Sequence, residues 1–218
     1  MQYLIKSKIK SFLEFIKTIE LENWIIKNQT IEERYEIMKN KYQYKELESI
    51  AKKNNINFDN REIISWMDNI NILYKVFKLL LTNDNEENYI KELINTLHII
   101  AEYKIPFYNN RIDYLLAKDN KILILEFSFA NKKSRTERFQ DKLNQVMNYK
   151  ELLYGILPNH LKISTYTFVI TPEKDENWND IENHLNEEIT ILSNFIFNYF
   201  KNTNQTAIEE LEKIKNNY

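Results

Sequence analysis

The sequence predicts a mixed α/β fold in which helices flank a small mixed sheet. Three observations support this prediction: apolar residues recur at helical spacing over roughly the first 96 residues, three short strand patterns then follow one another, and a further strand pattern comes after a helical segment. Adjacent short strands favour a meander, whereas a strand reached through a helix can pair in parallel by a right-handed crossover. The 218 residues suffice for one core with added helices.

The first 60 residues are expected to form an N-terminal helical region. Apolar residues between Leu4 and Ile16 have the spacing of an amphipathic helix that begins near the N-terminus. Thr30, followed three residues later by a glutamate, is a capping-box pattern that opens a second helix. A third helix is predicted from Tyr44 to Lys53.

Residues 61–175 are expected to form the core, and residues 176–218 to form C-terminal helices that pack on it. The strand at 121–129 is apolar on both faces, which is typical of a central strand. Gly155 fits a C-terminal cap for the preceding helix. The predicted elements are helices at 61–81, 87–97, 136–154, 178–200 and 206–214, and strands at 99–105, 111–117, 121–129 and 163–171.

Composition excludes several classes of function. The chain has no cysteine, which rules out disulfides, thiolate zinc sites and a cysteine nucleophile. Its single glycine cannot build a P-loop or a dinucleotide fingerprint. The net charge of −2 gives no general reason to expect a polyanionic partner, which would need a local positive patch. No signal peptide or bilayer-spanning apolar run is visible, so we expect a cytoplasmic protein without membrane association.

Two carboxylates are the strongest indication of chemistry in this sequence. Glu126 interrupts the apolar strand at 121–129, where an ionised side chain is costly to bury unless a cation or hydrogen-bond donors meet it. If the preceding hairpin closes at Asp119-Asn120, Asp113 comes opposite the 125–127 region. Hard cations such as Mg²⁺ bind a few carboxylate oxygens, a carbonyl and water. The pair therefore predicts a divalent metal site able to stabilise charge on a phosphate.

The helix at 136–154 is predicted to lie beside this pair. Gln145 and Tyr149 are four residues apart and share one side of the helix, and Arg138 and Lys142 fall on the same side. The neighbouring side is apolar at Phe139, Leu143, Val146, Met147 and Leu153, and it is expected to pack on the sheet. The segment also offers a positive surface suited to a phosphate backbone. Its basic residues are Lys132, Lys133, Arg135, Arg138, Lys142 and Lys150.

The order of these elements and motifs resembles that of the PD-(D/E)XK nuclease superfamily, and the helix resembles that of its RecB-type branch. A longer stretch, from Ser65-Trp66 through residues 101–106 to Glu126, is similar to the nuclease-like region found ahead of the motor in certain bacterial helicase-fused proteins. The resemblance covers roughly residues 65–171. The motifs that carry it are Asp113, Glu126-x-Ser128 and Gln145-x-x-x-Tyr149.

The resemblance implies a restriction-endonuclease-like core that hydrolyses phosphodiester bonds with Mg²⁺ or Mn²⁺. We expect the substrate to be DNA in preference to RNA, and the setting to be phage defence or a mobile element. By motif position, Asp113 and Glu126 would be metal ligands and Phe127 would lend its backbone carbonyl. Gln145 and Tyr149 would position the substrate or the site. The basic residues Lys132, Lys133, Arg135 and Arg138 would contact the nucleic acid.

One position departs from the family pattern. The lysine expected two residues after the acid, which normally helps to orient or activate the water, is Ser128 here. Three interpretations remain open: Lys142 substitutes for it, Lys132 or Lys133 reaches in from the loop, or the chemistry is impaired. In the last case the chain would be a nuclease-like module for nucleic-acid binding or protein assembly.

A structural interpretation also remains, in which both acids are simply paired with nearby lysine or arginine side chains. Glu102 and Asp68 are possible further acids, and Glu102 is expected in a salt bridge. The terminal helices offer a surface for a homodimer or a partner protein.

Overall fold

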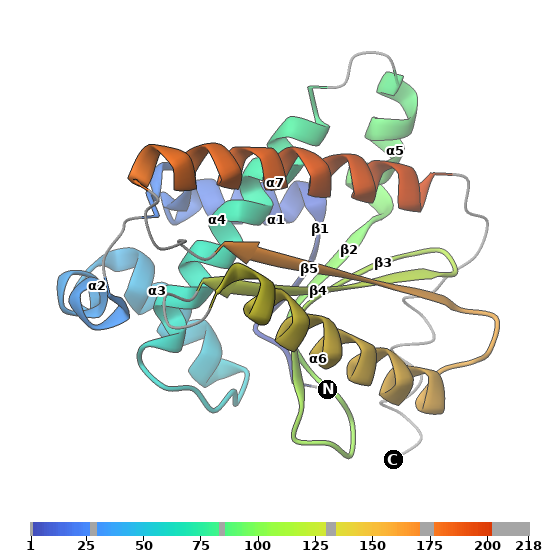
Figure 1. Ribbon diagram of the computed structural model, residues 1–218, viewed down its shortest axis with the longest axis horizontal. Coiled ribbons are helices and arrows are strands. Elements are labelled where there is room, and N and C mark those ends of the chain that lie inside the picture. The colour runs from blue at the N-terminus through green and yellow to red at the C-terminus, as the bar shows by residue number, and fades with distance from the viewer. Residues whose placement is uncertain (1, 27–29, 83–85, 130–133, 171–176, 202–218) are drawn as a thin grey trace.

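The computed structural model describes residues 2–26, 30–82, 86–129, 134–170 and 177–201. Within these residues, five strands form one mixed sheet (Figure 1). The first four strands pair antiparallel in chain order, and the fifth pairs in parallel with the fourth. The predicted mixed sheet is therefore confirmed. The strands are β1 (Ile5–Lys8), β2 (His98–Lys104), β3 (Arg111–Lys118), β4 (Lys121–Phe129) and β5 (Lys162–Ile170).

Helices cover both faces of this sheet, as the sequence predicts. The described helices match the predicted ones closely, and the last of them begins and ends where the sequence placed it. The helix predicted at 206–214 lies outside the described residues. No helix in the described part of the chain has the length and apolarity that a membrane span requires. The α-helices are α1 (Ile9–Thr18), α2 (Ile31–Met38), α3 (Tyr42–Lys53), α4 (Glu62–Leu80), α5 (Glu87–Thr96), α6 (Arg135–Ile156) and α7 (Trp178–Phe200).

Side chains at the helix starts fix where three of these helices begin. The predicted capping box of Thr30 at α2 is confirmed, because its hydroxyl accepts the Glu33 N–H and the Glu33 carboxylate accepts the Thr30 N–H. Ser134 forms the same box at α6, and Asn177 forms one at α7. Such caps satisfy N–H groups that lack a partner inside the helix.

Two hydrophobic cores lie on the two faces of the sheet. The larger core joins α1, α4, α5 and α7 to one face, and the smaller core joins α6 to the other face (Figure 1). Along β4, Leu123, Leu125 and Phe127 enter the larger core, whereas Ile122 and Ile124 enter the smaller one. The predicted central position of β4 is thereby confirmed. Each of these buried side chains contributes about 1.5–3 kcal/mol to folding.

The prediction of helix from the N-terminus onward is wrong for residues 5–8. These residues form β1, which pairs with β2 from Ile5 opposite Ala101 to Lys8 opposite His98. Helix α1 begins only at Ile9. The segment has the helical spacing of apolar residues, but pairing with the open edge of β2 outweighs that local preference.

The predicted C-terminal cap at Gly155 is also wrong. Gly155 lies inside the last turn of α6, which ends at Ile156. Leu157 follows in an extended conformation, and its N–H still donates to the carbonyl of Leu153. Leu157 is buried in the smaller core, so the chain leaves the helix toward an apolar site and needs no left-handed residue.

The apolar stripe of α6 packs on the sheet only in part. Val146 and Leu153 are buried as predicted, but Phe139 and Met147 are 44% and 43% exposed. The side that faces the sheet carries Tyr149 together with polar residues of the preceding turns. The helix is rotated relative to the prediction because the sheet presents acids, rather than apolar residues, to its N-terminal half.

Candidate active site

The β3–β4 hairpin brings the two predicted acids together. It turns at Asp119 and Asn120, with Lys118 paired to Lys121, as the sequence predicts. Tyr114 pairs with Leu125, so Asp113 comes next to Glu126 in the following row. The predicted placement of Asp113 opposite residues 125–127 is confirmed.

Each of these carboxylates accepts a hydrogen bond from the backbone of the other strand. The N–H of Asp113 donates to Glu126 Oε1 at 2.9 Å, and the N–H of Phe127 donates to Asp113 Oδ2 at 2.8 Å. At this point of the β3–β4 pairing, carboxylate oxygens accept the N–H groups that backbone carbonyls usually accept. The ring of Phe127 points to the other face and packs in the larger core.

Helix α6 supplies an amine to the same place. Lys142 Nζ lies 2.7 Å from Glu126 Oε2 and 3.9 Å from Asp113 Oδ2. The Lys142 side chain is only 14% exposed, so its charge is directed inward. Of the three lysines proposed as substitutes for the missing one, Lys142 is observed beside the acids. Lys132 and Lys133 lie outside the described residues.

Burial makes the two carboxylates unusually basic. Glu126 has no exposed surface, and this burial together with the charge of Asp113 raises the pKa of Glu126 to about 8, against the opposing effect of Lys142. Burial likewise raises the pKa of Asp113, while Lys142 acts to lower it. Burial alone would lower the pKa of Lys142, but the two acids raise it. One amine therefore stabilises two crowded acids.

A third acid, Glu102 of β2, stands in the same row. Its neighbours Ala101 and Tyr103 pair with Tyr114 and Ile112, so Glu102 comes next to Asp113. Glu102 is 3% exposed, and the predicted salt bridge is confirmed: Arg111 Nε lies 2.5 Å from Glu102 Oε2.

The backbone of Glu102 is left-handed, with φ 55°. This conformation interrupts the alternation of side chains, because Ile100 and Tyr103 both enter the smaller core although they are three residues apart. Burial and Asp113 raise the pKa of Glu102, while Arg111 opposes the rise. The sequence signal that could have marked this residue more strongly is the one used for Glu126, an acid inside an apolar strand.

Ser128 and Arg138 form a separate contact beside the acids. Ser128 is buried, and Arg138 Nε donates to its hydroxyl at 2.7 Å. The predicted common face of Glu126 and Ser128 is confirmed, since both contact α6. Ser128 thus anchors an arginine of α6 beside the acids.

Gln145 and Tyr149 face one another on α6, as their spacing predicts. Gln145 Nε2 donates to the Tyr149 hydroxyl at 2.6 Å. Burial, followed by the charge of Glu126, raises the pKa of Tyr149. Tyr149 therefore lies within electrostatic reach of the acids and packs in the smaller core. Arg135, in the first turn of α6, is half-buried.

The donor set at the acids fits a hard divalent cation that keeps much of its water. In the described part of the chain, no three or more His, Cys, Asp or Glu side chains form a metal-binding group. Mg²⁺ typically uses only one or two protein carboxylates together with water and substrate oxygens. Asp113, which is 23% exposed, and the fully buried Glu126 share Lys142, so two carboxyl groups face one amine.

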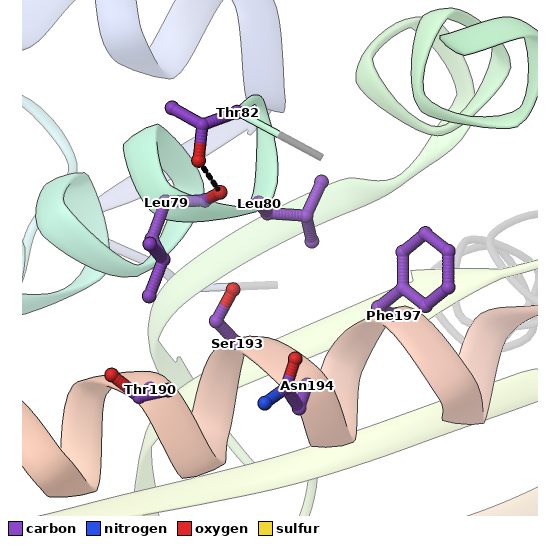
Figure 2. A pocket seen from close by; sticks show the side chains of 7 residues that line it. All are labelled: Leu79, Leu80, Thr82, Thr190, Ser193, Asn194 and Phe197. Atoms are coloured by element: carbon purple, nitrogen blue, oxygen red, sulfur yellow. Dashed lines mark hydrogen bonds between the residues drawn. The ribbon is translucent and has the colours of Figure 1, made fainter. Parts of the chain in front are cut away.

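A cavity of about 190 Å³ lies elsewhere, between the C-terminal end of α4 and α7 (Figure 2). Its walls are Leu79, Leu80 and Thr82 on one side and α7 residues from Thr190 to Phe197 on the other. The α4–α7 contact belongs to the larger core, on the face of the sheet opposite α6. Because no titratable side chain lines this cavity, it is not the candidate active site.

The fold and these contacts define a mixed α/β protein with a partly buried cluster of two carboxyl groups and a lysine on its central strands. No family model matches the chain, and neither the curated proteins nor the solved structures contain a match.

Proposed function

We propose that the protein is a nuclease that hydrolyses phosphodiester bonds with Mg²⁺ or Mn²⁺, on DNA in preference to RNA. The observation that carries this proposal is the position of Lys142, whose amine lies 2.7 Å from Glu126 and beside Asp113. Carboxylates that can hold a metal ion, with an amine beside them, suit metal-assisted phosphodiester hydrolysis. Lys142 offers from helix α6 the amine that Ser128 cannot offer from β4.

Asp113, Glu126 and the backbone carbonyl of Phe127 are the groups that would hold the metal ion. When bound, such an ion stabilises charge on a phosphate and lowers the pKa of a water molecule. The crowding of the carboxylates supports this assignment, because burial and mutual repulsion raise the pKa of Glu126 to about 8 in the metal-free protein.

The chain's own residues would orient the substrate and the attacking water. A lysine ammonium has three N–H donors, so Lys142 can hold Glu126 and still donate to a water or a phosphate oxygen. Ser128 fixes Arg138 on the same side of α6, where its guanidinium can contact phosphate. Gln145 and Tyr149 hold the next turn of this side in place.

Cleavage assays on single- and double-stranded DNA and RNA, with Mg²⁺ or Mn²⁺, test the proposal. We expect Asp113→Asn, Glu126→Gln and Lys142→Met each to lower the cleavage rate at least about 100-fold, since each removes a group that acts on the reacting atoms. Lys91→Met is the matched control, because Lys91 lies on α5, is 66% exposed and pairs with Glu87. This control should cleave at the wild-type rate. Cleavage that survives both acid substitutions would refute the proposal.

One observation favours a second candidate, a nuclease-like module that binds nucleic acid or assembles with protein but does not cleave. Lys142 and the backbone N–H groups already occupy oxygens of both acids, and Ser128 stands in the lysine position. Such a module would bind its nucleic acid or protein partner but cleave no nucleic acid, whichever metal ion is supplied. Glu126→Gln would leave this binding unchanged. Metal-dependent turnover by the wild-type protein would exclude it.

The cellular setting belongs to the same proposal. A cytoplasmic location suits a chain without cysteines. Phage defence or a mobile element is the context in which we expect such a nuclease. A homodimer or partner protein would use the terminal helices.

A further inference from the structure

The tip of the β2–β3 hairpin, residues 105–110, exposes two aromatic side chains. Phe107 is 69% exposed, more than any other large hydrophobic side chain in the described residues, and Tyr108 is 40% exposed. Both rings therefore present apolar surface to the solvent, where a ligand can reach it. The hairpin, in green, extends beyond the body of the sheet in Figure 1.

The tip is closed and rigid rather than a loose loop. The N–H of Ile105 donates to the carbonyl of Asn110 at 3.0 Å, and the N–H of Tyr108 donates to the carbonyl of Ile105 at 3.2 Å. Pro106 fixes its own φ angle at the start of the turn. The aromatic pair is therefore presented in a defined position, which lowers the entropy lost on binding.

Phe107 also occupies a backbone conformation that disfavours it. Its φ is 68°, in the left-handed region where glycine is at ease and a bulky residue is strained. Strained residues of this kind cluster at functional sites. The Phe107 ring is mostly exposed and belongs to neither hydrophobic core, so a ligand can reach it.

The tip lies close to the candidate active site and carries no negative charge. Lys104 pairs with Arg111 at its base, and the row of Glu102 and Asp113 lies two residues further along the strands. Ile105, at the base of the tip, is three residues from Glu102 along β2, which corresponds to about 10 Å. No acidic residue occurs between Tyr103 and Ile112, and Lys104 is exposed.

We propose that Phe107 and Tyr108 form a stacking platform for unpaired bases of a nucleic acid whose backbone passes the acid pair. Aromatic rings beside basic side chains are the usual means of binding single strands, because every base has a face that can stack. Lys104 adds a phosphate contact at the edge of the platform. The proposal rests on the proposed function in that its ligand is a nucleic acid.

The test is the binding of a fluorescein-labelled single-stranded DNA of mixed sequence to the full chain in EDTA, measured by fluorescence anisotropy. We expect Phe107→Ala to weaken binding about 5- to 100-fold and Tyr108→Ala to weaken it less, as exposure suggests. A 2-aminopurine base in the same oligonucleotide should lose its stacking quench with Phe107→Ala. Ile37→Ala, at an exposed apolar residue on α2, is the control and should bind like the wild type.

Phe107→Gly separates binding from folding. It relieves the left-handed strain, so we expect its Tm to rise by about 2–4 °C while its affinity falls as much as that of Phe107→Ala. A residue that only supports the hairpin would lower the Tm instead. That result, or tip variants that change only the oligomeric state, overturns the proposal.

The outcomes also separate this proposal from the proposed function. A wild-type protein that binds and cleaves DNA, with tip variants that bind equally well, refutes the platform alone. Binding that depends on Phe107 without any cleavage in metal refutes the nuclease alone. A wild-type protein that binds no single-stranded DNA refutes the platform, and cleavage of duplex substrates then decides the nuclease separately.

Discussion

Asp68 and Glu126 are both buried acids, but the protein surrounds them differently. Asp68 of α4 is 2% exposed and faces Arg34 of α2, which donates to both of its oxygens. Trp24 Nε1 adds a third hydrogen bond at 2.8 Å, and the Arg34 guanidinium lies over the Trp24 ring. One acid thus meets one guanidinium of matching geometry.

Glu126 shares its lysine with a second acid. Lys142 lies 2.7 Å from Glu126 and 3.9 Å from Asp113, and Glu102 stands one strand further on with its own Arg111. The comparison shows that burial of an acid does not by itself indicate a catalytic or metal-binding role. A fully paired acid joins two helices, whereas crowded acids with too few cations are poised to take another charge.

The largest effect is expected at the fully paired acid. Arg34→Leu would leave the Asp68 carboxylate buried without its cation, so we expect a loss of about 3–5 kcal/mol in the free energy of unfolding. Urea denaturation measures this value. Arg61→Leu is the control, because Arg61 pairs with Asp59 and Glu32 while 53% exposed, and its loss should change the free energy of unfolding far less. Equal losses of stability in Arg34→Leu and Arg61→Leu would contradict the expected difference between a buried and an exposed ion pair.

An intermediate effect is expected from pH at the crowded acids. The pKa of Glu126 is raised to about 8 in the folded protein against 4.5 as its ordinary value, so the folded state binds the proton more tightly. The resulting stability is present below about pH 4.5 and is lost as the pH rises through 8.

We therefore expect the protein in EDTA to lose on the order of 2 kcal/mol between pH 6 and pH 8.5, as measured by urea denaturation. Glu126→Gln should remove the part of this pH dependence that Glu126 contributes, while the raised pKa values of Asp113 and Glu102 account for the remainder. A stability that is the same at both pH values, or that rises with pH, would show that Glu126 is already ionised at pH 6.

The smallest effect is expected at Ser128. Ser128→Ala removes one hydrogen bond from Arg138, so stability should fall by about 1 kcal/mol. If Lys142 supplies the amine, cleavage should stay within a few-fold of the wild-type rate. A loss of cleavage as large as that expected for Lys142→Met would instead make Ser128 itself part of the chemistry.

The parts of this structure that could be predicted from sequence are those encoded locally. The β3–β4 hairpin follows from two apolar runs and the Asp119-Asn120 turn, and it alone brings Asp113 to Glu126. The capping box at Thr30 is contained in four residues. Each of these signals can be evaluated without knowing the rest of the fold.

The parts that could not be predicted depend on contacts between distant segments. The rotation of α6 decides that Lys142 reaches Glu126 and that Phe139 stays exposed, and this rotation depends on what the sheet presents. The partner of Asp68 is 34 residues away along the chain. Strand β1 exists because β2 offers it an edge, although its own residues also fit a helix.

Strand β1 has a consequence for how the protein behaves in concentrated solution. It is four residues long, carries Lys6 and Lys8, and forms the outer edge of the sheet next to β2. A short edge strand with lysines resists pairing with another molecule. Behind it, β2 is buried from Ile99 to Tyr103, so removal of β1 would uncover a longer apolar edge. Strand β1 thus protects the sheet against edge-to-edge aggregation, and a variant in which residues 5–8 cannot pair with β2 should associate more readily than the wild type.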